Sequence, residues 1–272
     1  MTTGLERIAT KAREDKKLRF TSLAHHITPA LLSQCLMAMA NNSGTGVDQM
    51  TVSQAKESIQ QWAPEIIDSM YRQGYRPPPV RRVYIPKPGK QEKRPLGVPS
   101  VTDRCLQGAV AKVLGALYEQ DFLDCSMGGR KGCSAHQAVA TFCKATASRK
   151  VNWVYEADLK NFFGSLDHGW VERFVSERVG DPRIMSLIKR WLKAGIIEEG
   201  QWYSTEQGTP QGGPISVLIS NIYLHYVLDL WIEKVVKPRM AGEVYYIRYV
   251  DDFVLCFQYK TDAQRFEKAL VK

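Results

Sequence analysis

The chain has 272 residues, of which 44% are hydrophobic and 10% aromatic, enough to bury a large core in one domain or two subdomains. Its formal net charge of +9 points to a polyanionic partner or an anionic membrane surface. Asn221, His225 and Asp229 interrupt the longest apolar run, so we expect no membrane span. The charged N-terminus also lacks the apolar centre of a secretory signal peptide.

The six cysteines are scattered along the chain and form no Cys-x-x-Cys pair. This spacing disfavours a zinc site. Reduced, mostly structural thiols are typical of a cytoplasmic protein.

The first part of the chain is predicted to be helical. Residues 1–30 form a charged lead-in, for which a solvated helix face is the simpler interpretation and a nucleic-acid-contacting arm the more specific one. A stripe of apolar residues predicts a helix over 29–40. Residues 51–73 predict a further helical pair, punctuated by Pro64.

A basic segment follows, and its alternation predicts two short strands around a loop, the first over 80–85. A solvated basic hairpin is the simpler interpretation. Phosphate binding is favoured, because a proline-stiffened backbone holds cations together at low entropic cost. Against one acid, Glu92, this segment carries seven basic residues: Arg76, Arg81, Arg82, Lys87, Lys90, Lys93 and Arg94.

The next elements alternate between core and loop. Ser100 and Asp103 resemble a capping box that opens a helix to about residue 122. A glycine-rich loop over 126–134 contains Arg130 and Lys131, but it lacks Walker A spacing and is a weak phosphate signal. A helix is expected from about 135 to 144.

Asp158 ends a predicted strand over 151–158, from which its side chain can converge on the tip of a neighbouring hairpin. Asp181 and Pro182 cap a helix that ends at Gly195. A hairpin turning at residues 199–200 and a buried helix over about 214–236 come next.

Residues 245–259 predict two strands with Asp251 and Asp252 at the connecting turn. Two adjacent carboxylates beside an apolar hairpin cost free energy unless a cation binds them. A solvated acidic turn is the alternative, but the apolar flanks favour a metal site. The order of strands and helices predicts most of a βαββαβ sheet.

Several motifs of this chain resemble those of reverse transcriptases. The palm motifs of that family are similar to Asp158 with Phe162-Phe163, Pro210–Gly213 and Tyr249–Asp252. The fingers segment of the bacterial group II intron branch is similar to Ile85–Lys87, Arg94–Pro99 with Asp103-Arg104, 126–136 and 221–224. The resemblance covers roughly residues 30–260. Gly164 stands where Asp is frequent and Val217 where proline is usual, yet no departure removes a metal ligand.

The resemblance implies an α+β fold, that of right-hand polymerase fingers and palm. The palm would be a βαββαβ-like antiparallel sheet backed by helices. The lead-in would be 1–30, the fingers 31–150 and the palm 151–272, with fingers segments able to interleave. A thumb, a later palm strand and a maturase domain are expected to be absent, as in a trimmed form of a longer protein.

The resemblance also implies a metal site. Asp158 and Asp251 would hold two Mg²⁺ ions, for which Mn²⁺ is a possible substitute, with Asp252 as a secondary catalytic carboxylate. The Leu159 carbonyl would be a further metal ligand. Two hard cations can activate a primer 3′-hydroxyl and stabilise the departing pyrophosphate.

Other residues would bind the nucleotide and nucleic acid. Lys87 and Arg94 match the triphosphate-binding cations of the family, Phe163 matches its steric gate against a ribose 2′-hydroxyl, and Gln211 matches a nucleotide-positioning glutamine. The remaining nucleic-acid-binding candidates are Arg81, Arg82, Lys90, Lys93, Arg130 and Lys131.

The function implied is that of an RNA-directed DNA polymerase core of a bacterial group II intron-encoded protein. Its partners would be an RNA template or intron RNA, a DNA primer and deoxynucleotides. An RNA-binding splicing cofactor (maturase) without productive polymerisation is one alternative, and a diversity-generating or phage-defence reverse transcriptase is another. The intact carboxylates favour the polymerase, because a protein that only binds RNA gains nothing from acidic groups facing a phosphate backbone. We expect the chain alone to polymerise weakly or not at all, and to form a homodimer.

Overall fold

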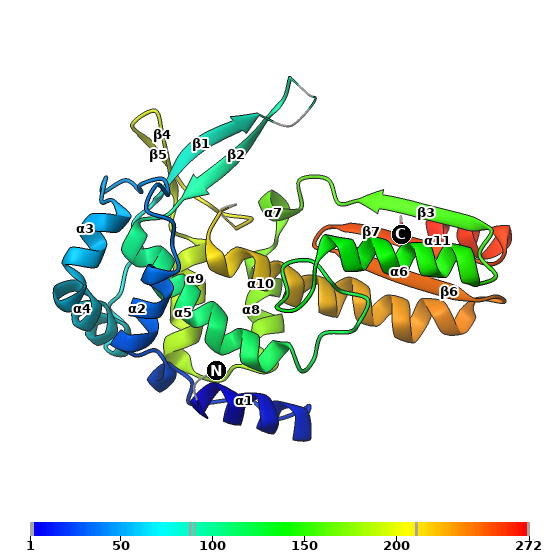
Figure 1. Ribbon diagram of the computed structural model, residues 1–272, viewed down its shortest axis with the longest axis horizontal. Helices are drawn as coiled ribbons and strands as arrows, with labels where there is room; N and C mark the ends of the chain where they lie inside the picture. Colours follow the sequence, from blue (N-terminus) through cyan, green and yellow to red (C-terminus); the bar gives the residue numbers. More distant parts are fainter. Residues whose placement is uncertain (1–2, 87–88, 90, 210–211, 271–272) are drawn as a thin grey trace. The chain divides into compact units, whose positions relative to one another are not determined.

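The computed structural model describes residues 3–86, 89, 91–209 and 212–270 (Figure 1). The chain divides into two compact units, each built from two stretches of sequence: Met1–Asp121 with Phe163–Ile219, and Phe122–Phe162 with Ser220–Lys272. These units do not coincide with a division at residue 150. That division remains a prediction about the domains of the protein.

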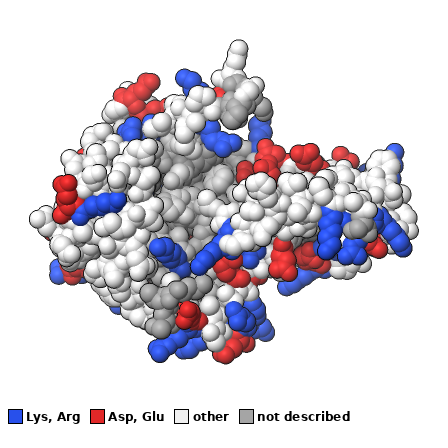
Figure 2. Space-filling model, viewed as in Figure 1, with Lys and Arg blue, Asp and Glu red and all other residues white. Residues whose placement is uncertain are grey.

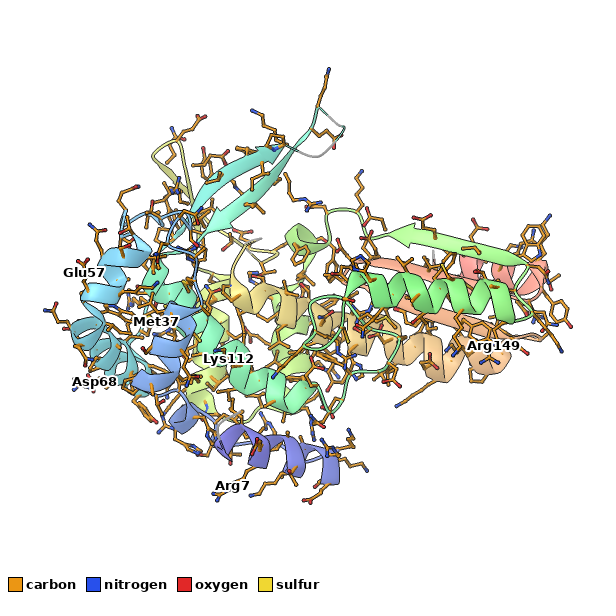
Figure 3. The ribbon with its side chains drawn as sticks, in the orientation of Figure 1. Arg7, Met37, Glu57, Asp68, Lys112 and Arg149 are labelled. Carbon is orange, nitrogen blue, oxygen red and sulfur yellow. The ribbon has the colours of Figure 1, made fainter. Side chains whose placement is uncertain are left out.

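The first unit is mainly helical and carries one mixed sheet. Its helices include α1, whose exposed Arg7 points away from the fold (Figure 3). The elements that lie wholly in this unit are α1 (Thr3–Glu14), η1 (Ala24–His26), α2 (Pro29–Met37), α3 (Val52–Glu57), α4 (Ile59–Tyr71), β1 (Val80–Pro86), β2 (Lys93–Val98), α5 (Val101–Tyr118), α8 (His168–Ser176), α9 (Pro182–Leu192), β4 (Ile196–Glu198) and β5 (Gln201–Tyr203).

The predicted helical pair over 51–73 is present, but its break is not at Pro64. The helices α3 and α4 separate at Ser58, which has non-helical dihedral angles. Pro64 lies inside α4 and is tolerated there, although a proline removes one backbone hydrogen bond. The capping box before α5 is also only half formed. The Ser100 side chain accepts from the Asp103 backbone N–H, whereas the Asp103 carboxylate has other partners.

Asp103 is buried and joins three parts of the first unit. Its Oδ1 accepts hydrogen bonds from the Tyr75 hydroxyl and from Trp191 Nε1, both at 2.8 Å. Its Oδ2 accepts from Gln107 Nε2 at 2.9 Å. Burial raises the pKa of Asp103 from its usual value, although these donors act in the opposite direction. The residue that the sequence pattern assigned to a cap is therefore the polar centre of a helical core.

The sheet of the first unit has the strand order β2-β1-β4-β5. The strands β1 and β2 pair antiparallel and confirm the predicted basic hairpin. The strands β4 and β5 are joined by a two-residue turn, Glu199-Gly200, in which both residues have positive φ. This is the turn that the sequence predicted, and its geometry suits tightly twisted hairpins.

The second unit consists of an antiparallel sheet with helices against it. The sheet order is β3-β7-β6. In this unit α6 packs on β6, while α11 packs on β3 and β7. Its elements are α6 (Ala135–Ser148), β3 (Trp153–Asp158), η2 (His225–Asp229), η3 (Ile232–Val236), η4 (Lys237–Arg239), β6 (Val244–Tyr249), β7 (Asp252–Phe257) and α11 (Lys260–Leu270). Two further helices, α7 (Phe162–Ser165) and α10 (Pro214–Leu224), cross the boundary between the units.

A continuous helical run from α10 to η4 contains two π-helical segments, η2 and η3. By length and composition this run is long and apolar enough to cross a membrane. The interruption by Asn221, His225 and Asp229, from which we expected no membrane span, does not prevent this. However, 61% of its most apolar window is buried inside the fold, which is typical of a core helix. The expectation of a buried, largely apolar helix is therefore confirmed.

Candidate active site

The hairpin of β6 and β7 places the adjacent aspartates differently from the sequence expectation. The last residue pair of the hairpin is Tyr249 with Asp252. The two-residue loop is therefore Val250-Asp251, and Asp252 is the first residue of β7. The expected Asp251-Asp252 turn was wrong by one residue. Antiparallel register, set by the apolar residues of both strands, decides which residues remain for the loop.

Val250 adopts a positive φ of 59°, which is unusual for a β-branched residue. A positive φ at the first loop residue alone is typical of a type II′ turn, where glycine is preferred. Such a conformation costs about 1–3 kcal/mol and persists only where the surrounding structure enforces it. Strain is therefore stored in the residue immediately before Asp251.

The carboxylates come together through the strand register. Asp158 is the last residue of β3 and lies directly opposite Asp252 of β7. Directly opposed residues point to the same face of a sheet, and like charges there are destabilising. Acidic side chains gather along the edge that carries β3 (Figure 2). Asp158 and Asp252 are exposed, and Asp251 is half-buried.

The chemistry of this donor set fits a hard divalent cation, because Mg²⁺ and Ca²⁺ bind carboxylate and carbonyl oxygens. Within the described part of the chain, no three His, Cys, Asp or Glu side chains are gathered as a metal cluster. The register thus places Asp158 and Asp252 opposite each other on one face of the sheet, and Asp251 precedes Asp252 in the chain. The Leu159 carbonyl follows Asp158 and already accepts the Phe162 N–H at 3.2 Å.

Phe163 lies in the short helix α7 and is half-buried. Its carbonyl accepts the backbone N–H of Thr209 at 2.7 Å. Gly208 has a positive φ, and a Cβ at this position would meet the Phe163 carbonyl at 2.7 Å. The backbone of the predicted steric gate is thus bonded to the segment that leads to residues 210–211. Gln211 itself lies outside the described residues.

The basic hairpin of the first unit has two faces, and its cations are divided between them. Arg94 is opposite Ile85 and shares its face with Arg81, whereas Lys93 is opposite Pro86 and shares the other face with Arg82. Both Lys93 and Arg94 are exposed. Among the described strand residues, the four cations Arg81, Arg82, Lys93 and Arg94 therefore do not share one face. Lys87 and Lys90 lie outside the described residues.

Three of the predicted nucleic-acid contacts have internal partners. Arg81 donates from Nε and Nη2 to the Thr45 carbonyl. Arg82 approaches Glu198 at 3.9 Å. Arg130 donates from Nη1 to the carbonyls of Leu123 and Ser126, at 2.8 and 2.6 Å, which fixes the loop that it belongs to. Lys131, by contrast, is exposed.

The residue that sequence reasoning missed is Arg248, which is fully buried in β6. It forms a salt bridge of 2.6 Å with Asp229, which is also fully buried. Burial acts to lower the pKa of Arg248, but the hydrogen bonds and charge of Asp229 outweigh it and raise that pKa. The available sequence signal was an arginine between apolar residues of a core strand, together with an aspartate in an otherwise apolar helix.

Two neighbours are affected by this ion pair. The Tyr246 hydroxyl donates to Asp229 Oδ1 at 2.8 Å, and burial together with the Asp229 charge raises its pKa far above the usual value. Burial also lowers the pKa of His225 to about 4. The charge of Asp229 acts against this shift, and the charge of Arg248 adds to it. His225 Nδ1 is buried without a hydrogen-bond partner among the described residues.

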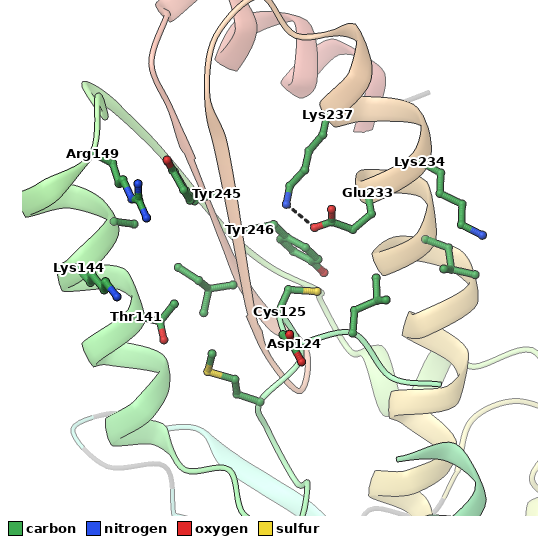
Figure 4. A pocket seen from close by; sticks show the side chains of 15 residues that line it. Asp124, Cys125, Thr141, Lys144, Arg149, Glu233, Lys234, Lys237, Tyr245 and Tyr246 are labelled. Carbon is green, nitrogen blue, oxygen red and sulfur yellow. Dashed lines mark hydrogen bonds and ion pairs between the residues drawn. The ribbon is translucent and has the colours of Figure 1, made fainter. Parts of the chain in front are cut away.

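A groove of about 660 Å³ lies beside this core, between α6, β6 and the long helical run (Figure 4). Tyr246 and Cys125 line it, and burial raises the pKa of the Cys125 thiol to about 12, so the thiol stays protonated. Lys144 and Lys237 are at its sides, and Lys237 pairs with Glu233. The groove contains none of the predicted catalytic carboxylates.

Comparison with known proteins identifies the class of this chain. Residues 85–272 match the reverse transcriptase (RNA-dependent DNA polymerase) family. The chain therefore belongs to the reverse transcriptase family, and the expected fold of fingers and palm is confirmed. Within that family it is of the group II intron type, as its relatives indicate.

One such relative is the group II intron-encoded protein LtrA of Lactococcus lactis subsp. cremoris, 34% identical over 231 residues. Another is protein YkfC of Escherichia coli (strain K12), 33% identical over 286 residues. The match covers 83% of this chain and 38% of LtrA, and 92% of this chain and 74% of YkfC. The chain thus spans less than half the length of LtrA.

The fold is also found in a solved structure, a partial Cas6-RT-Cas1–Cas2 complex. The TM-score is 0.52 and the identity 24%, and the match covers 90% of this chain and 40% of that chain. This likeness concerns the fold alone.

The buried histidine predicts an acid-sensitive fold. Because the pKa of His225 is about 4 in the folded state and 6.5 ordinarily, the unfolded chain binds a proton between these pH values that the folded chain does not. The free energy of unfolding should fall by up to about 3 kcal/mol as pH drops from 6.5 to 4. Urea denaturation at several pH values measures it.

His225→Leu removes the titrating group and should flatten this pH dependence, whereas His136→Gln at an exposed position should leave it unchanged. An equally steep loss of stability in His225→Leu would contradict the assignment.

Proposed function

We propose that this chain is the catalytic core of an RNA-directed DNA polymerase from a group II intron-encoded protein. The observation that carries the proposal is the pairing of Asp158 with Asp252 across β3 and β7, with Asp251 beside Asp252 in a strained loop. Opposed carboxylates are unfavourable in a sheet without a cation. Their place in a chain of the reverse transcriptase family supports a metal-dependent nucleotidyl transfer to a primer 3′-hydroxyl.

The cofactor proposed is Mg²⁺, for which Mn²⁺ could substitute. Asp158 and Asp251 would hold it, with Asp252 as a further carboxylate and the Leu159 carbonyl as an additional ligand. When bound, such ions lower the pKa of the attacking hydroxyl and neutralise charge on the departing pyrophosphate. The contribution of the chain itself is to keep these oxygens in register at the end of a rigid sheet.

The substrates proposed are a deoxynucleoside triphosphate, a DNA primer and an RNA template, with intron RNA as the partner in splicing. Lys87 and Arg94 would bind the triphosphate, Gln211 would position the nucleotide, and Phe163 would exclude a ribose 2′-hydroxyl. Lys93 and Lys131 are the better candidates for nucleic-acid contact among the described basic residues, because Arg81 and Arg130 are bonded to backbone carbonyls. We place the protein in the bacterial cytoplasm.

The metal assignment predicts the effect of Asp251→Asn. This change removes one ligand charge without disturbing the core, so primer extension on an RNA template should fall at least about 100-fold while unfolding stays nearly unchanged. The measurement uses the full protein that contains these residues.

Glu156→Gln is the matched control, since Glu156 is an exposed carboxylate two residues before Asp158 on the same face of β3. It should extend primers at a rate close to wild type. Near wild-type extension by Asp251→Asn would refute the assignment, and RNA binding without extension by the wild-type protein would favour the maturase alternative.

The basic hairpin predicts salt-dependent RNA binding. Lys93→Ala and Arg94→Ala should each weaken binding of structured RNA, and each should reduce the slope of log affinity against log salt by about 1, because one phosphate contact is lost. Arg72→Ala, at a position paired with Asp68 on α4, should leave the slope unchanged. Binding that does not respond to salt would exclude this surface.

We also propose that the chain forms a homodimer. Among the described residues β3 has a partner strand only on its β7 side, and its Trp153 and Val154 side chains are 42% and 50% exposed. Open strand edges and exposed apolar side chains favour association. Sedimentation over a range of concentrations should show a dimer that Val154→Lys weakens. A monomer at all concentrations would contradict this proposal.

A further inference from the structure

The guanidinium of Arg248 has all five of its N–H groups in hydrogen bonds. Arginine offers five donors in a rigid planar fork, so such saturation requires acceptors placed on several sides. The acceptors come from three separate segments of the second unit. They are Asp229 Oδ1 for Nε, Asn221 Oδ1 and the Val250 carbonyl for Nη1, and Ser126 Oγ and Asp229 Oδ2 for Nη2, at distances of 2.6–2.9 Å.

One of these acceptors belongs to the strained loop. Arg248 Nη1 donates to the Val250 carbonyl at 2.8 Å, and Val250 is the residue with the positive φ. Gly128 also contacts this loop, so closely that a Cβ there would meet the Val250 backbone nitrogen at 2.4 Å. The Gly128 carbonyl accepts from Asn221 Nδ2, and Asn221 also accepts from the guanidinium. The loop is thus held between Arg248 and a glycine that belongs to the same hydrogen-bond network.

A π-helical segment separates the two partners of Arg248 that lie on the long helix. Asn221 and Asp229 are eight residues apart, and both reach one guanidinium. In a regular α-helix each step of four residues turns by about 40° past a full turn, so two steps would turn Asp229 by about 80° from the Asn221 direction. The wider π turn η2 (His225–Asp229) offsets this drift.

We propose that Arg248 is a positioning residue for metal binding: through the Val250 carbonyl it holds the strained loop that presents Asp251 beside the Asp158 and Asp252 pair. This inference rests on the proposed function of those carboxylates. The hydrogen bonds of the guanidinium reach the candidate site at the Val250 carbonyl, so its effect on Asp251 passes through the backbone of the loop. Besides its place in the core of the unit, the guanidinium therefore controls the conformation of Val250.

The first test compares Arg248→Lys with a matched buried arginine. A lysine keeps the charge opposite Asp229, but it cannot reach acceptors on several sides. Arg248→Lys should raise the half-saturating Mg²⁺ concentration for primer extension by about 10-fold or more, in the range found when partners of metal ligands are removed. At saturating Mg²⁺ the deoxynucleotide KM should change by less than about 2-fold.

The control is Arg178→Lys in the first unit. Arg178 is 2% exposed, pairs with Asp121 and donates to the carbonyls of Ala12, Asp15 and Leu18. Its replacement should destabilise the protein but leave the half-saturating Mg²⁺ concentration unchanged. An equal shift in both variants, or in neither, would overturn the proposal.

The second test relieves the strain directly. Glycine adopts positive φ without strain, so Val250→Gly should reduce the dependence of the loop on Arg248. In the double variant with Arg248→Lys, the half-saturating Mg²⁺ concentration should recover by at least about 3-fold relative to Arg248→Lys alone. No recovery would mean that Arg248 acts other than through the Val250 conformation.

The third test does not depend on activity. Amide hydrogen exchange of residues 249–252 should be at least about 10-fold faster in Arg248→Lys than in Arg178→Lys. If Arg248→Lys does not fold, Ser126→Ala removes one acceptor of the guanidinium and should still accelerate this exchange. Unchanged exchange would refute the inference. Absence of primer extension by the full wild-type protein that contains these residues would instead refute the proposed polymerase function, and the exchange result would still decide the role of Arg248.

Discussion

The buried ion pair of Arg248 and Asp229 is the interaction on which the order of the second unit depends. Removing two charges from water costs several kcal/mol per ion, and this cost is offset only where the remaining polar atoms are also satisfied. Here every guanidinium N–H has an acceptor, and the partners come from the long helix, the loop before α6 and the tip of the hairpin. Displacement of the loop or of the hairpin tip would leave a buried guanidinium N–H without an acceptor, and displacement of the long helix would leave the buried charge without its partner. The pair therefore selects one arrangement of the unit, beyond what apolar burial specifies.

The candidate metal site gains its geometry from two different sources. The position of Asp158 opposite Asp252 follows from strand register, which apolar burial on one face of the sheet fixes strongly. The position of Asp251 is different, because it lies in a loop whose preferred conformation would place glycine at Val250. Register alone leaves that loop free to relax. The hydrogen bond from Arg248 to the Val250 carbonyl supplies the constraint that register does not. Asp158 and Asp252 are thus positioned by apolar packing of the sheet, and Asp251 by a buried polar network.

Elements with strong local signals could be predicted from the sequence. The predictions were wrong, or missing, for residues whose position depends on contacts with distant parts of the chain. Strands around Asp158 and the hairpin, the helix capped by Asp181 and the turn at Glu199 have local causes, and each is present. The loop residue pair was misplaced by one, because the choice depends on cross-strand register. Asp103 was assigned to a cap, because its three side-chain donors lie far away in sequence or on the next turn. Arg248 gave only a weak signal, since a buried arginine is recognisable only once Asp229 is placed beside it.

The basic hairpin shows why a count of charges does not define a binding surface. Strand alternation sends Arg94 and Lys93 to opposite faces, so a phosphate chain running along one face meets only two of the four cations described on these strands. Arg81, on the Arg94 face, is already bonded to the Thr45 carbonyl, while Arg82, on the Lys93 face, lies near Glu198. The face of Arg94 thus presents its cation beside Ile85 and Leu96, and the face of Lys93 presents its cation beside Tyr84 and Pro95. A hairpin built in this way can contact two different anionic groups, one on each face, as the proposed binding of a nucleotide and a polynucleotide requires.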